Sequence, residues 1–392
     1  MSELRTSTGP PQTDELPPVP EWTGVAPRNP APPSLVPRRT TRAVQVGPVT
    51  IGGGAPVSVQ SMTITKTDDW AATLEQIHAL AAAGCEIARV SVPDAKAAAA
   101  CVKIKEGSPL PLVADIHFDH RYALAAIDAG WDKLRLNPGN IRDAAKVREV
   151  VKAAAARRMP IRIGVNNGSL APDIVERYGH TPEGMVESGL RHLRILEELD
   201  FHDIVVSLKA HDVRTTVAAY RLMATKVDYP FHLGITEAGT LRSGTVKSSV
   251  GLGLLLAEGI GDTIRVSLTA DPVEEVPVCW DILKSLGLRE RGVEITSCPS
   301  CGRVQIDIVK LAEQVERITA EYRAPVKVAV MGCAVNGPGE ASMADVGIAG
   351  GKGMGLIYRD GVMIRSLPEA QLLAGLREEI EKVIKERYPE YA

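Results

Sequence analysis

The stretch PLVADIHF, residues 111–118, sets the pattern that predicts the fold: an apolar run ends in polar residues, and a segment with helical spacing follows. Seven further runs repeat the pattern, and in chain order they are VSVQSMT (57–63), IARVSVP (87–93), KLRLNP (133–138), PIRIGVNN (160–167), DIVVSLKA (203–210), FHLGITEA (231–238) and TIRVSLTA (263–270). Eight strands alternating with helices are typical of a (β/α)8 TIM-type barrel. A doubly wound open sheet shows the same alternation and stays the competing architecture, although the count of eight favours the barrel.

The composition and periodicity of the sequence change on both sides of this pattern. Residues 1–40 contain ten prolines and no periodic apolar pattern, which predicts a disordered tail. After Gly287 the alternation stops, and strand-like and helical segments mix over about 100 residues. We therefore predict a tail (1–40), a barrel domain (41–288) and a small α+β domain (289–392).

Composition excludes some classes of protein. The net charge of −3 provides no overall basic field, which argues against a nucleic-acid binder. No apolar run approaches the length that spans a bilayer, and the N-terminus lacks the apolar core of a signal peptide. Six cysteines in 392 residues do not make a disulfide framework. A cytoplasmic location with no membrane partner is expected.

Three cysteines of the small domain lie in glycine- and proline-containing turns that follow predicted strands. Cys298 and Cys301 form a C-x-x-C in TSCPSCGR, and Cys333 stands in MGCAVNGPGE. Sulfur ligands at neighbouring strand ends suit zinc or an iron–sulfur cluster. The domain contains no histidine to complete a zinc site, because the last histidine is His232. Glu340 is the nearest candidate for a fourth ligand, across a turn that folds back, and as a weakly held ligand it would leave one iron able to exchange it for substrate.

The C-terminal ends of the barrel strands carry a second group of candidates. Cations occur there inside otherwise apolar strands, which is unfavourable unless they are paired or bind an anion. The predicted substrate-binding residues are Arg89, Asp115, His117, Arg135, Asn137, Arg162, Asn166, Lys209, Thr236, Arg265 and Ser267. Arginine forks suit phosphate oxygens, so a small molecule with two phosphates or a diphosphate is expected. The alternative is a set of internal salt bridges to Asp115 and Glu237, and Glu237 is otherwise the candidate proton donor.

Ten motifs in order carry a resemblance to a known family. They are QSMTITKTD, RVSVP, ADIHFD, RLNPGNI, IRIGVNNGS, SLKAHD, GITEAGT, IRVSLT, CPSCGR and GCAVNGPGE. Together they resemble the bacterial 4-hydroxy-3-methylbut-2-enyl diphosphate synthases of the non-mevalonate isoprenoid pathway, in their short form, from about residue 40 to 385.

The resemblance implies an activity and a cofactor. The family reduces 2-C-methyl-D-erythritol 2,4-cyclodiphosphate by two electrons to the open allylic diphosphate, with loss of water. It uses a [4Fe-4S] cluster held by three cysteines and a glutamate, which correspond to Cys298, Cys301, Cys333 and Glu340. The electron donor would be ferredoxin or flavodoxin. A head-to-tail homodimer is also implied, in which the cluster domain of one subunit closes over the barrel of the other.

Two other functions remain possible from the residues. One is a barrel transferase of the pterin-binding type with structural zinc in the small domain. The other is a non-enzymatic iron–sulfur redox sensor in which the barrel is only a scaffold. The first predicts a colourless zinc protein, and the second predicts a coloured protein that is indifferent to the cyclic diphosphate.

Overall fold

The structure is a computed structural model that describes residues 36–117, 119–137, 140–141 and 143–392. The described chain divides into two compact units, a first that ends at Gly292 and a second that runs from Val293 to Ala392. Each unit has its own apolar core and is described by itself. None of the described helices is long and apolar enough to cross a membrane.

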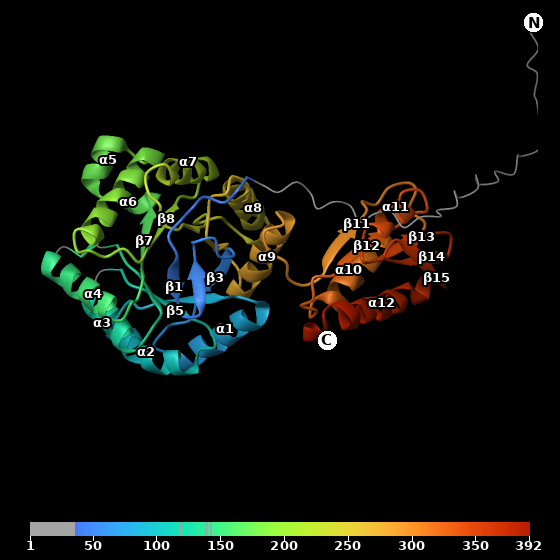
Figure 1. Ribbon diagram of the computed structural model, residues 1–392, viewed down its shortest axis with the longest axis horizontal. Helices are drawn as coiled ribbons and strands as arrows, with labels where there is room; N and C mark the ends of the chain where they lie inside the picture. The colour runs from blue at the N-terminus through green and yellow to red at the C-terminus, as the bar shows by residue number, and fades with distance from the viewer. Residues whose placement is uncertain (1–35, 118, 138–139, 142) are drawn as a thin grey trace, which may run out of the picture. The chain divides into compact units, whose positions relative to one another are not determined.

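The first unit is built on a parallel eight-stranded sheet with the strand order β8-β7-β6-β5-β4-β3-β10-β9 (Figure 1). Its strands are β3 (Ser58–Met62), β4 (Ile87–Ser91), β5 (Leu112–Asp115), β6 (Lys133–Arg135), β7 (Ile161–Asn166), β8 (Ile204–Lys209), β9 (His232–Leu233) and β10 (Thr263–Ile264). A parallel bridge between Val206 and Phe231 joins β8 to β9 and completes the ring. The predicted TIM-type barrel is confirmed, and an open doubly wound sheet is excluded by this closure.

Strands β9 and β10 are shorter than the sequence predicted. Beyond Leu233 the chain leaves the ladder at Gly234, where an added Cβ would lie 2.8 Å from Lys209 Nζ. Glu237 then adopts a φ of +52° and Gly239 a φ of +119°, which no strand can contain. The apolar run FHLGITEA therefore supplies a two-residue strand and a tight loop.

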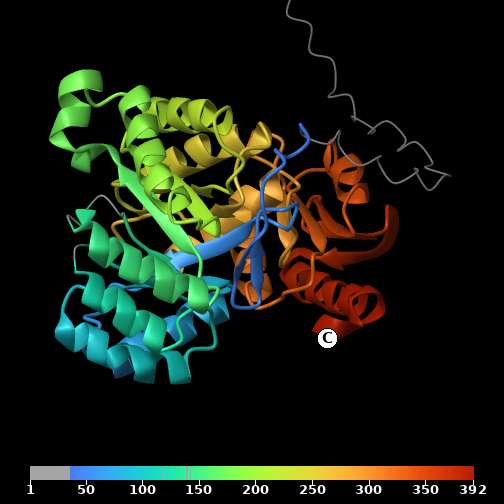
Figure 2. The same ribbon diagram turned by 60° about the vertical axis from the view of Figure 1, so that its left-hand side comes forward.

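Helices pack around the outside of the ring (Figures 1 and 2). They are α1 (Trp70–Ala83), α2 (Ala95–Gly107), α3 (His120–Asp128), α4 (Ala144–Ala156), α5 (Pro172–Tyr178), α6 (Pro182–Glu197), α7 (Val213–Ala224), α8 (Leu241–Ala257) and α9 (Glu275–Ser285). Aspartates begin several of them: Asp69, Asp94 and Asp212 each accept a hydrogen bond from a backbone N–H of the first turn. Gly84 ends α1 in the left-handed conformation.

A short hairpin closes the N-terminal end of the barrel. Strands β1 (Val44–Val46) and β2 (Val49–Ile51) pair antiparallel. Their buried residues Val44, Val46 and Ile51 pack against Ile87, Val113 and Val205, one from each of β4, β5 and β8. The hairpin therefore covers this end of the barrel with an apolar cluster.

The chain that leads into this hairpin is held to the barrel. The Arg38 guanidinium forms an ion pair with Asp262 at 2.9 Å, and the Arg39 guanidinium stacks on the Phe231 ring at 4.1 Å. Both residues fall inside the tail predicted from the prolines, most of which lies outside the described residues. The packed part of the barrel unit thus includes residues that composition alone placed in the tail.

The second unit is a mixed five-stranded sheet with helices on both faces. Its strands, in sheet order, are β11 (Glu294–Ser297), β12 (Lys327–Met331), β13 (Val346–Gly350), β14 (Met354–Arg359) and β15 (Val362–Pro368). The first three are parallel, and the last two pairings are antiparallel. Helices α10 (Ile308–Thr319) and α12 (Leu372–Arg387) share one apolar core with the sheet, and α11 (Gly337–Ser342) packs in a separate cluster. This is the expected α+β fold.

Candidate functional site

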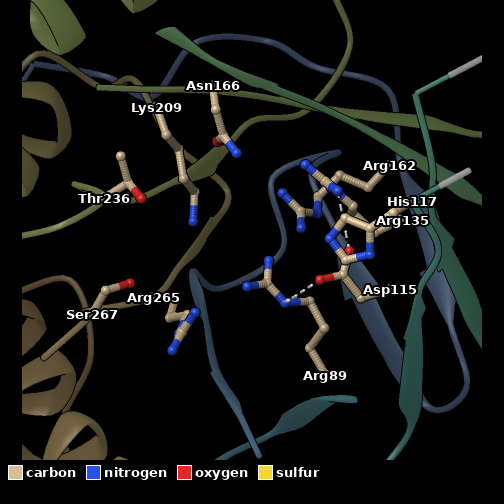
Figure 3. Close-up of a pocket in the computed structure, with 10 residues that line it drawn as sticks. All are labelled: Arg89, Asp115, His117, Arg135, Arg162, Asn166, Lys209, Thr236, Arg265 and Ser267. Carbon is tan, nitrogen blue, oxygen red and sulfur yellow. Dashed lines mark ion pairs between the residues drawn. The ribbon is translucent and has the colours of Figure 1, made fainter. Parts of the chain in front are cut away.

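A pocket opens at the C-terminal ends of the barrel strands and is lined almost entirely by polar side chains (Figure 3). Its lining consists of Arg89, Asp115, His117, Arg135, Arg162, Asn166, Lys209, Thr236, Arg265 and Ser267. The structure thus brings together ten of the eleven residues that the sequence predicted for substrate binding. Five of the ten are cations.

Strand alternation explains why these cations face a common space. On β6 and β7, Arg135 and Arg162 are register partners that point into the barrel, whereas Leu134 between Lys133 and Arg135 belongs to the core beneath the helices. The same alternation turns Arg89 inward between the core residues Ala88 and Val90 of β4. On β4, β6 and β7 a period of two therefore separates an inner face that carries cations from an apolar outer face.

Asp115 is the anionic partner of two of the arginines. Its carboxylate lies 3.3 Å from Arg135 Nη1 and 3.9 Å from Arg89 Nε. Burial by itself would raise the pKa of Asp115, but the charges of Arg89 and Arg135 outweigh it and lower the pKa. The carboxylate is consequently ionised and orients both guanidinium groups toward the pocket.

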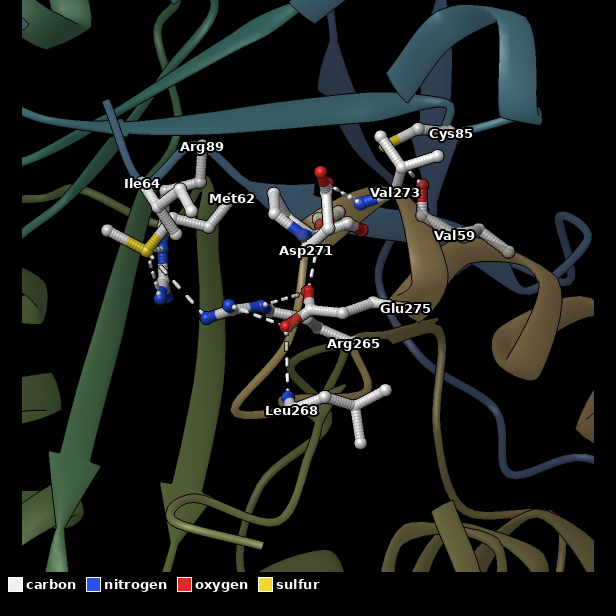
Figure 4. Close-up of polar contacts among 12 residues, drawn as sticks. Val59, Met62, Ile64, Cys85, Arg89, Arg265, Leu268, Asp271, Val273 and Glu275 are labelled. Carbon is white, nitrogen blue, oxygen red and sulfur yellow. Dashed lines mark hydrogen bonds and ion pairs between the residues drawn. The ribbon is translucent and has the colours of Figure 1, made fainter. Parts of the chain in front are cut away.

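Arg265 is oriented by a residue that the sequence analysis missed (Figure 4). Its Nε and Nη2 each lie 3.1 Å from the carboxylate of Glu275, at the start of α9, and the Leu268 N–H donates to the same carboxylate at 3.1 Å. The alternative of internal salt bridges named Asp115 and Glu237 as the partners, whereas the second partner in the structure is Glu275. Glu275 lies eight residues past Ser267, at the N-terminus of the next helix, and no local sequence pattern indicated that it would pair with Arg265.

Met62 separates two of the pocket arginines. Its sulfur accepts hydrogen bonds from Arg89 Nε and Nη2 at 3.0 and 2.8 Å, and Arg265 Nη1 lies 3.7 Å away (Figure 4). Sulfur is a weak acceptor, so this contact fixes geometry without neutralising charge. The charges of the two guanidinium groups are offset by Asp115 and Glu275, and not by Met62.

Arg162 and Lys209 are buried without an ionic partner among the described residues. Arg162 is 1% exposed; its Nη1 donates to the Ser207 hydroxyl, while its Nε and Nη2 have no acceptor in the part of the chain that the structure covers. Burial and the neighbouring guanidinium groups lower the pKa of Lys209 well below its ordinary value. Both side chains are therefore poised for an anion that the protein itself does not supply.

Asn137 has a different place from the one predicted. It is buried, and its amide binds the backbone of β7: Nδ2 donates to the Gly164 carbonyl at 2.8 Å and Oδ1 accepts from the Gly164 N–H at 2.8 Å. Arg135 Nη2 also donates to that carbonyl, at 3.0 Å. Gly164 leaves room for this arrangement, since an added Cβ would lie 2.6 Å from Arg135 Nε. Asn137 thus connects two strand ends and does not line the pocket.

A second pocket adjoins the first and shares Asn166 and Thr236 with it. Its lining consists of Asn166, Asn167, Gly168, Ser169, Ala210, His211, Thr236 and Glu237, with no arginine or lysine among them. Glu237 lies here in a left-handed conformation, which is unfavourable for a side chain with a Cβ and is typical of functional sites. The site thus has a cationic compartment and a neighbouring compartment that carries a carboxylate.

In the second unit, two of the three cysteines follow adjacent parallel strands. Cys298 follows β11 and donates its N–H to Val330 of β12 at 3.2 Å, and its sulfur accepts from the Gly332 N–H at 3.2 Å. Cys333 is the next residue. Two of the three cysteines predicted for one sheet edge thus follow neighbouring strand ends, and the placement of Cys301 with them stays a prediction. The segment from Cys333 to Glu340 ends in helix α11, however, where we expected a turn, because Pro338 follows Gly337 at the first positions of a helix.

The local backbone stabilises thiolates at this edge. Hydrogen bonding from the N–H of Asn336, with smaller contributions from those of Val335 and Gly337, lowers the pKa of Cys333. Hydrogen bonding by the backbone and side chain of Arg303 lowers the pKa of Cys301. Arg303 is a further residue that the sequence analysis did not single out, although it ends the CPSCGR motif. Deprotonated sulfur is the form that binds metal.

Comparisons with known proteins identify the family. The GcpE TIM-barrel domain matches residues 41–280, and the GcpE protein C-terminal domain matches residues 294–382. The chain belongs to the GcpE family. The family resemblance predicted from the ten motifs is thereby confirmed.

Full-length relatives support the GcpE assignment. The chain is 59% identical to a 4-hydroxy-3-methylbut-2-en-1-yl diphosphate synthase (flavodoxin) from Geobacter sulfurreducens, over 89% of this chain and 99% of the relative. It is 58% identical to the synthase from Geobacillus kaustophilus, over 90% and 95%, and 55% identical to that from Bacillus subtilis, over 90% and 93%. Neither the zinc transferase nor the redox sensor is supported.

The cysteine edge of this GcpE protein fits an iron–sulfur cluster by its chemistry. Soft sulfur donors are the ligands that such clusters use, and the second unit supplies three of them. Across the described residues, no three His, Cys, Asp or Glu side chains are already placed to hold a metal ion. Glu340 is exposed on α11. These residues therefore have the right ligand chemistry, and binding of the iron–sulfur cluster would have to bring them together.

Proposed function

We propose that this chain converts 2-C-methyl-D-erythritol 2,4-cyclodiphosphate to (E)-4-hydroxy-3-methylbut-2-enyl diphosphate through the barrel pocket and the cysteine edge. The activity and the [4Fe-4S] cofactor follow from GcpE family membership, and the chain is an iron–sulfur oxidoreductase of isoprenoid biosynthesis. The assignment of roles to residues is the part proposed here. One observation carries it: five cations and five further polar residues line one pocket at the strand ends.

The cationic compartment is proposed to bind the two phosphates. Arginine forks donate paired hydrogen bonds to phosphate oxygens, and Lys209 adds a point charge. Arg162 has two nitrogens without an acceptor among the described residues, so a phosphate oxygen would satisfy donors that are otherwise buried and unpaired. Asp115 and Glu275 hold the remaining arginines in place and partly offset their mutual repulsion.

The cluster ligands are proposed to be Cys298, Cys301, Cys333 and Glu340. When bound, the cluster supplies electrons one at a time to the ring-opening and dehydration chemistry. The relatives are named for flavodoxin, which favours flavodoxin over ferredoxin as the electron donor. A cytoplasmic location belongs to the proposal as well, because all six cysteines are free thiols, as a reducing compartment maintains them.

Glu237 is proposed as the proton donor to the departing hydroxyl. It lines the compartment next to the cations, so a substrate whose phosphates lie in the ring would extend its hydroxyl-bearing carbons toward this carboxyl. We expect Glu237→Gln to lower kcat by roughly 100- to 1000-fold, as for other general acids, with little change in substrate affinity. A kcat within a few-fold of the parent would remove Glu237 from this role.

A homodimer is part of the proposal, and one helix face supports it. Val246, Val250 and Leu254 lie four residues apart on α8 and are 61%, 50% and 44% exposed. Such a stripe of exposed apolar side chains is typical of a surface covered by a partner. We infer that a second copy covers it, since a head-to-tail dimer is what the family resemblance implies.

A mixing experiment tests the shared site directly. Lys209→Ala disables the barrel pocket and Cys333→Ser disables the cluster edge, so each homodimer is inactive. If each site combines the barrel of one copy with the cluster unit of another, co-expression restores up to about a quarter of parental activity, because half of the dimers are mixed and each has one intact site. If both parts act within one copy, the mixture stays inactive.

The overall function is tested by spectroscopy on anaerobically purified protein. We expect the visible absorbance of a four-iron cluster. After reduction, we expect an electron paramagnetic resonance signal that changes when the cyclic diphosphate is added. Zinc in place of iron, or a cluster signal indifferent to the cyclic diphosphate, would contradict the proposal. Turnover with reduced flavodoxin then tests the donor.

A further inference from the structure

Lys133 is a fully buried lysine that none of the predicted roles uses. It begins β6 and is 0% exposed. It lies two residues before Arg135 on the same inward face of the strand, so its Cα precedes that of Arg135 by about 6.6 Å along the strand. Its Nζ has no hydrogen-bond partner among the residues that the structure describes. It therefore belongs to a layer directly beneath the pocket.

The groups that surround this layer are mostly positive. The inward charged or titratable groups, in strand order, are Arg89 on β4, Asp115 and His117 near the end of β5, Arg135 on β6, Arg162 on β7, Lys209 on β8, His232 on β9 and Arg265 after β10. Strand β3 contributes only uncharged side chains, Gln60 and Met62. The carboxylates are Asp115 and Glu275, and both are already paired with arginines. No carboxylate in the described barrel pairs with Lys133.

This imbalance favours loss of charge at the buried lysines, at Lys133 in the lower layer as well as at Lys209 in the pocket, and not at the arginines. Arginine keeps its proton in proteins, whereas lysine loses it when burial and like charges disfavour the ammonium form. Burial, with the charges of Arg162 and Arg89, lowers the pKa of Lys133 well below its ordinary value. Burial, with Lys209 and Arg162 nearby, also lowers the pKa of His232. A bound diphosphate would reverse the sign of the local field.

We propose that Lys133 forms a second, buried layer of the anion site. Its amine is uncharged in the empty barrel and takes up a proton when a diphosphate enters the pocket above it. The proton moves from solvent to Lys133 Nζ, and no other bond changes. The inference rests on the proposed function, because it requires that the pocket binds the cyclic diphosphate. Lys133 would then act as a positioning residue, through the field it adds beneath Arg135 and Arg162.

The cyclic diphosphate is a suitable probe of this proton uptake. Each of its phosphorus atoms carries a single acidic hydroxyl that is already ionised at neutral pH, so the ligand itself takes up no proton. The holoenzyme with its cluster oxidised and no electron donor cannot turn over. Titration calorimetry at one pH in buffers of different ionisation enthalpy then yields the number of protons taken up on binding.

We expect the parent enzyme to take up at least about one proton on binding. Lys133→Met, which preserves length and removes the titratable group, should lower that number by nearly one. Lys133→Arg should do the same, because its charge is permanent. Lys152→Met, an exposed lysine on α4, serves as the matched control and should leave the number unchanged.

The sign of the pH dependence follows from the uptake. Because the complex holds the extra proton, binding should weaken as pH rises, with Kd increasing by up to about tenfold per pH unit for each proton taken up. Both Lys133 variants should flatten this dependence. Binding heat without any buffer dependence in the parent enzyme, or an unchanged number in folded Lys133 variants, overturns the inference. Absence of binding heat would instead count against the proposed function.

Discussion

The barrel pocket and the cysteine edge prepare for their ligands in opposite ways. In the barrel, closed strands hold cations at set positions, and Asp115, Glu275 and Met62 orient them before any ligand arrives. At the cysteine edge, backbone N–H groups lower the thiol pKa values of Cys301 and Cys333, but among the described residues no set of ligands is assembled. One site is built by the scaffold, and the other depends on its cofactor.

The difference follows from what each region can bury. Guanidinium groups inside a barrel are stable only when the surrounding strands fix their partners, so the geometry is determined by the fold. Thiolates at a sheet edge need little more than hydrogen-bond donors, and a metal group supplies the remaining constraint when it binds. Substitutions should therefore separate the two regions by which measurement they change.

The largest effect is expected at the cysteine edge. Cys333→Ser should abolish cluster absorbance and lower turnover by at least about 100-fold, since loss of a ligand exceeds the usual effect of losing its supporting contacts. Binding of the cyclic diphosphate to the barrel should persist in calorimetry. Cys101→Ser, in a buried thiol of α2, is the control that should retain the cluster. A Cys333→Ser protein with normal iron content would show that Cys333 is not a cluster ligand.

In the barrel we expect a change in substrate binding and in protein stability, and a smaller effect than at the cysteine edge. Arg162→Met removes a buried cation that has no carboxylate partner, so the free energy of unfolding should rise by roughly 1 to 4 kcal/mol. Binding should weaken by about 3 kcal/mol, or roughly 100-fold, because phosphate loses a desolvated partner. Thermal unfolding and calorimetry measure the two changes. A variant that is less stable yet binds normally would show that Arg162 is structural.

The effect of Glu340→Ala on turnover should be smaller than that of Cys333→Ser. Because Glu340 is exposed on α11 and distinct from the sulfur donors, most of the iron should remain, while turnover should fall by roughly 10- to 100-fold. Iron analysis paired with steady-state rates would separate these outcomes. Full activity with full iron content would remove Glu340 from the ligand set, and Glu369→Ala, at another exposed carboxylate of the same unit, is the control.

The smallest kinetic effect is expected for Asn137→Ala. Its amide holds the Gly164 N–H and carbonyl, so its loss should lower the free energy of unfolding by about 1 to 3 kcal/mol. The Michaelis constant should change less than in Arg162→Met, since Asn137 does not line the pocket. Denaturant unfolding beside steady-state kinetics tests this. A larger loss of binding than of stability would return Asn137 to the group of direct ligands.

Much of this molecule was predictable from local sequence. Apolar runs of period two, helical spacing between them and capping aspartates and glycines are short-range features, so they determined eight strands, the alternating helices and the strand ends that carry the cations. The placement of Cys298 and Cys333 after strands was equally local. These features depend on residues that are neighbours along the chain.

Only the tertiary structure decided which side chains meet. Ring closure brought Arg265, just past the last strand, next to Met62 of the first, and it paired Arg265 with Glu275, a carboxylate that the sequence did not indicate. It turned Asn137 onto a neighbouring strand, and it left Lys133 beneath the pocket with no carboxylate partner among the described residues. Periodicity determines on which face of a strand a residue lies. What lies opposite depends on how the sheet closes, and that is determined by contacts between residues far apart in the sequence.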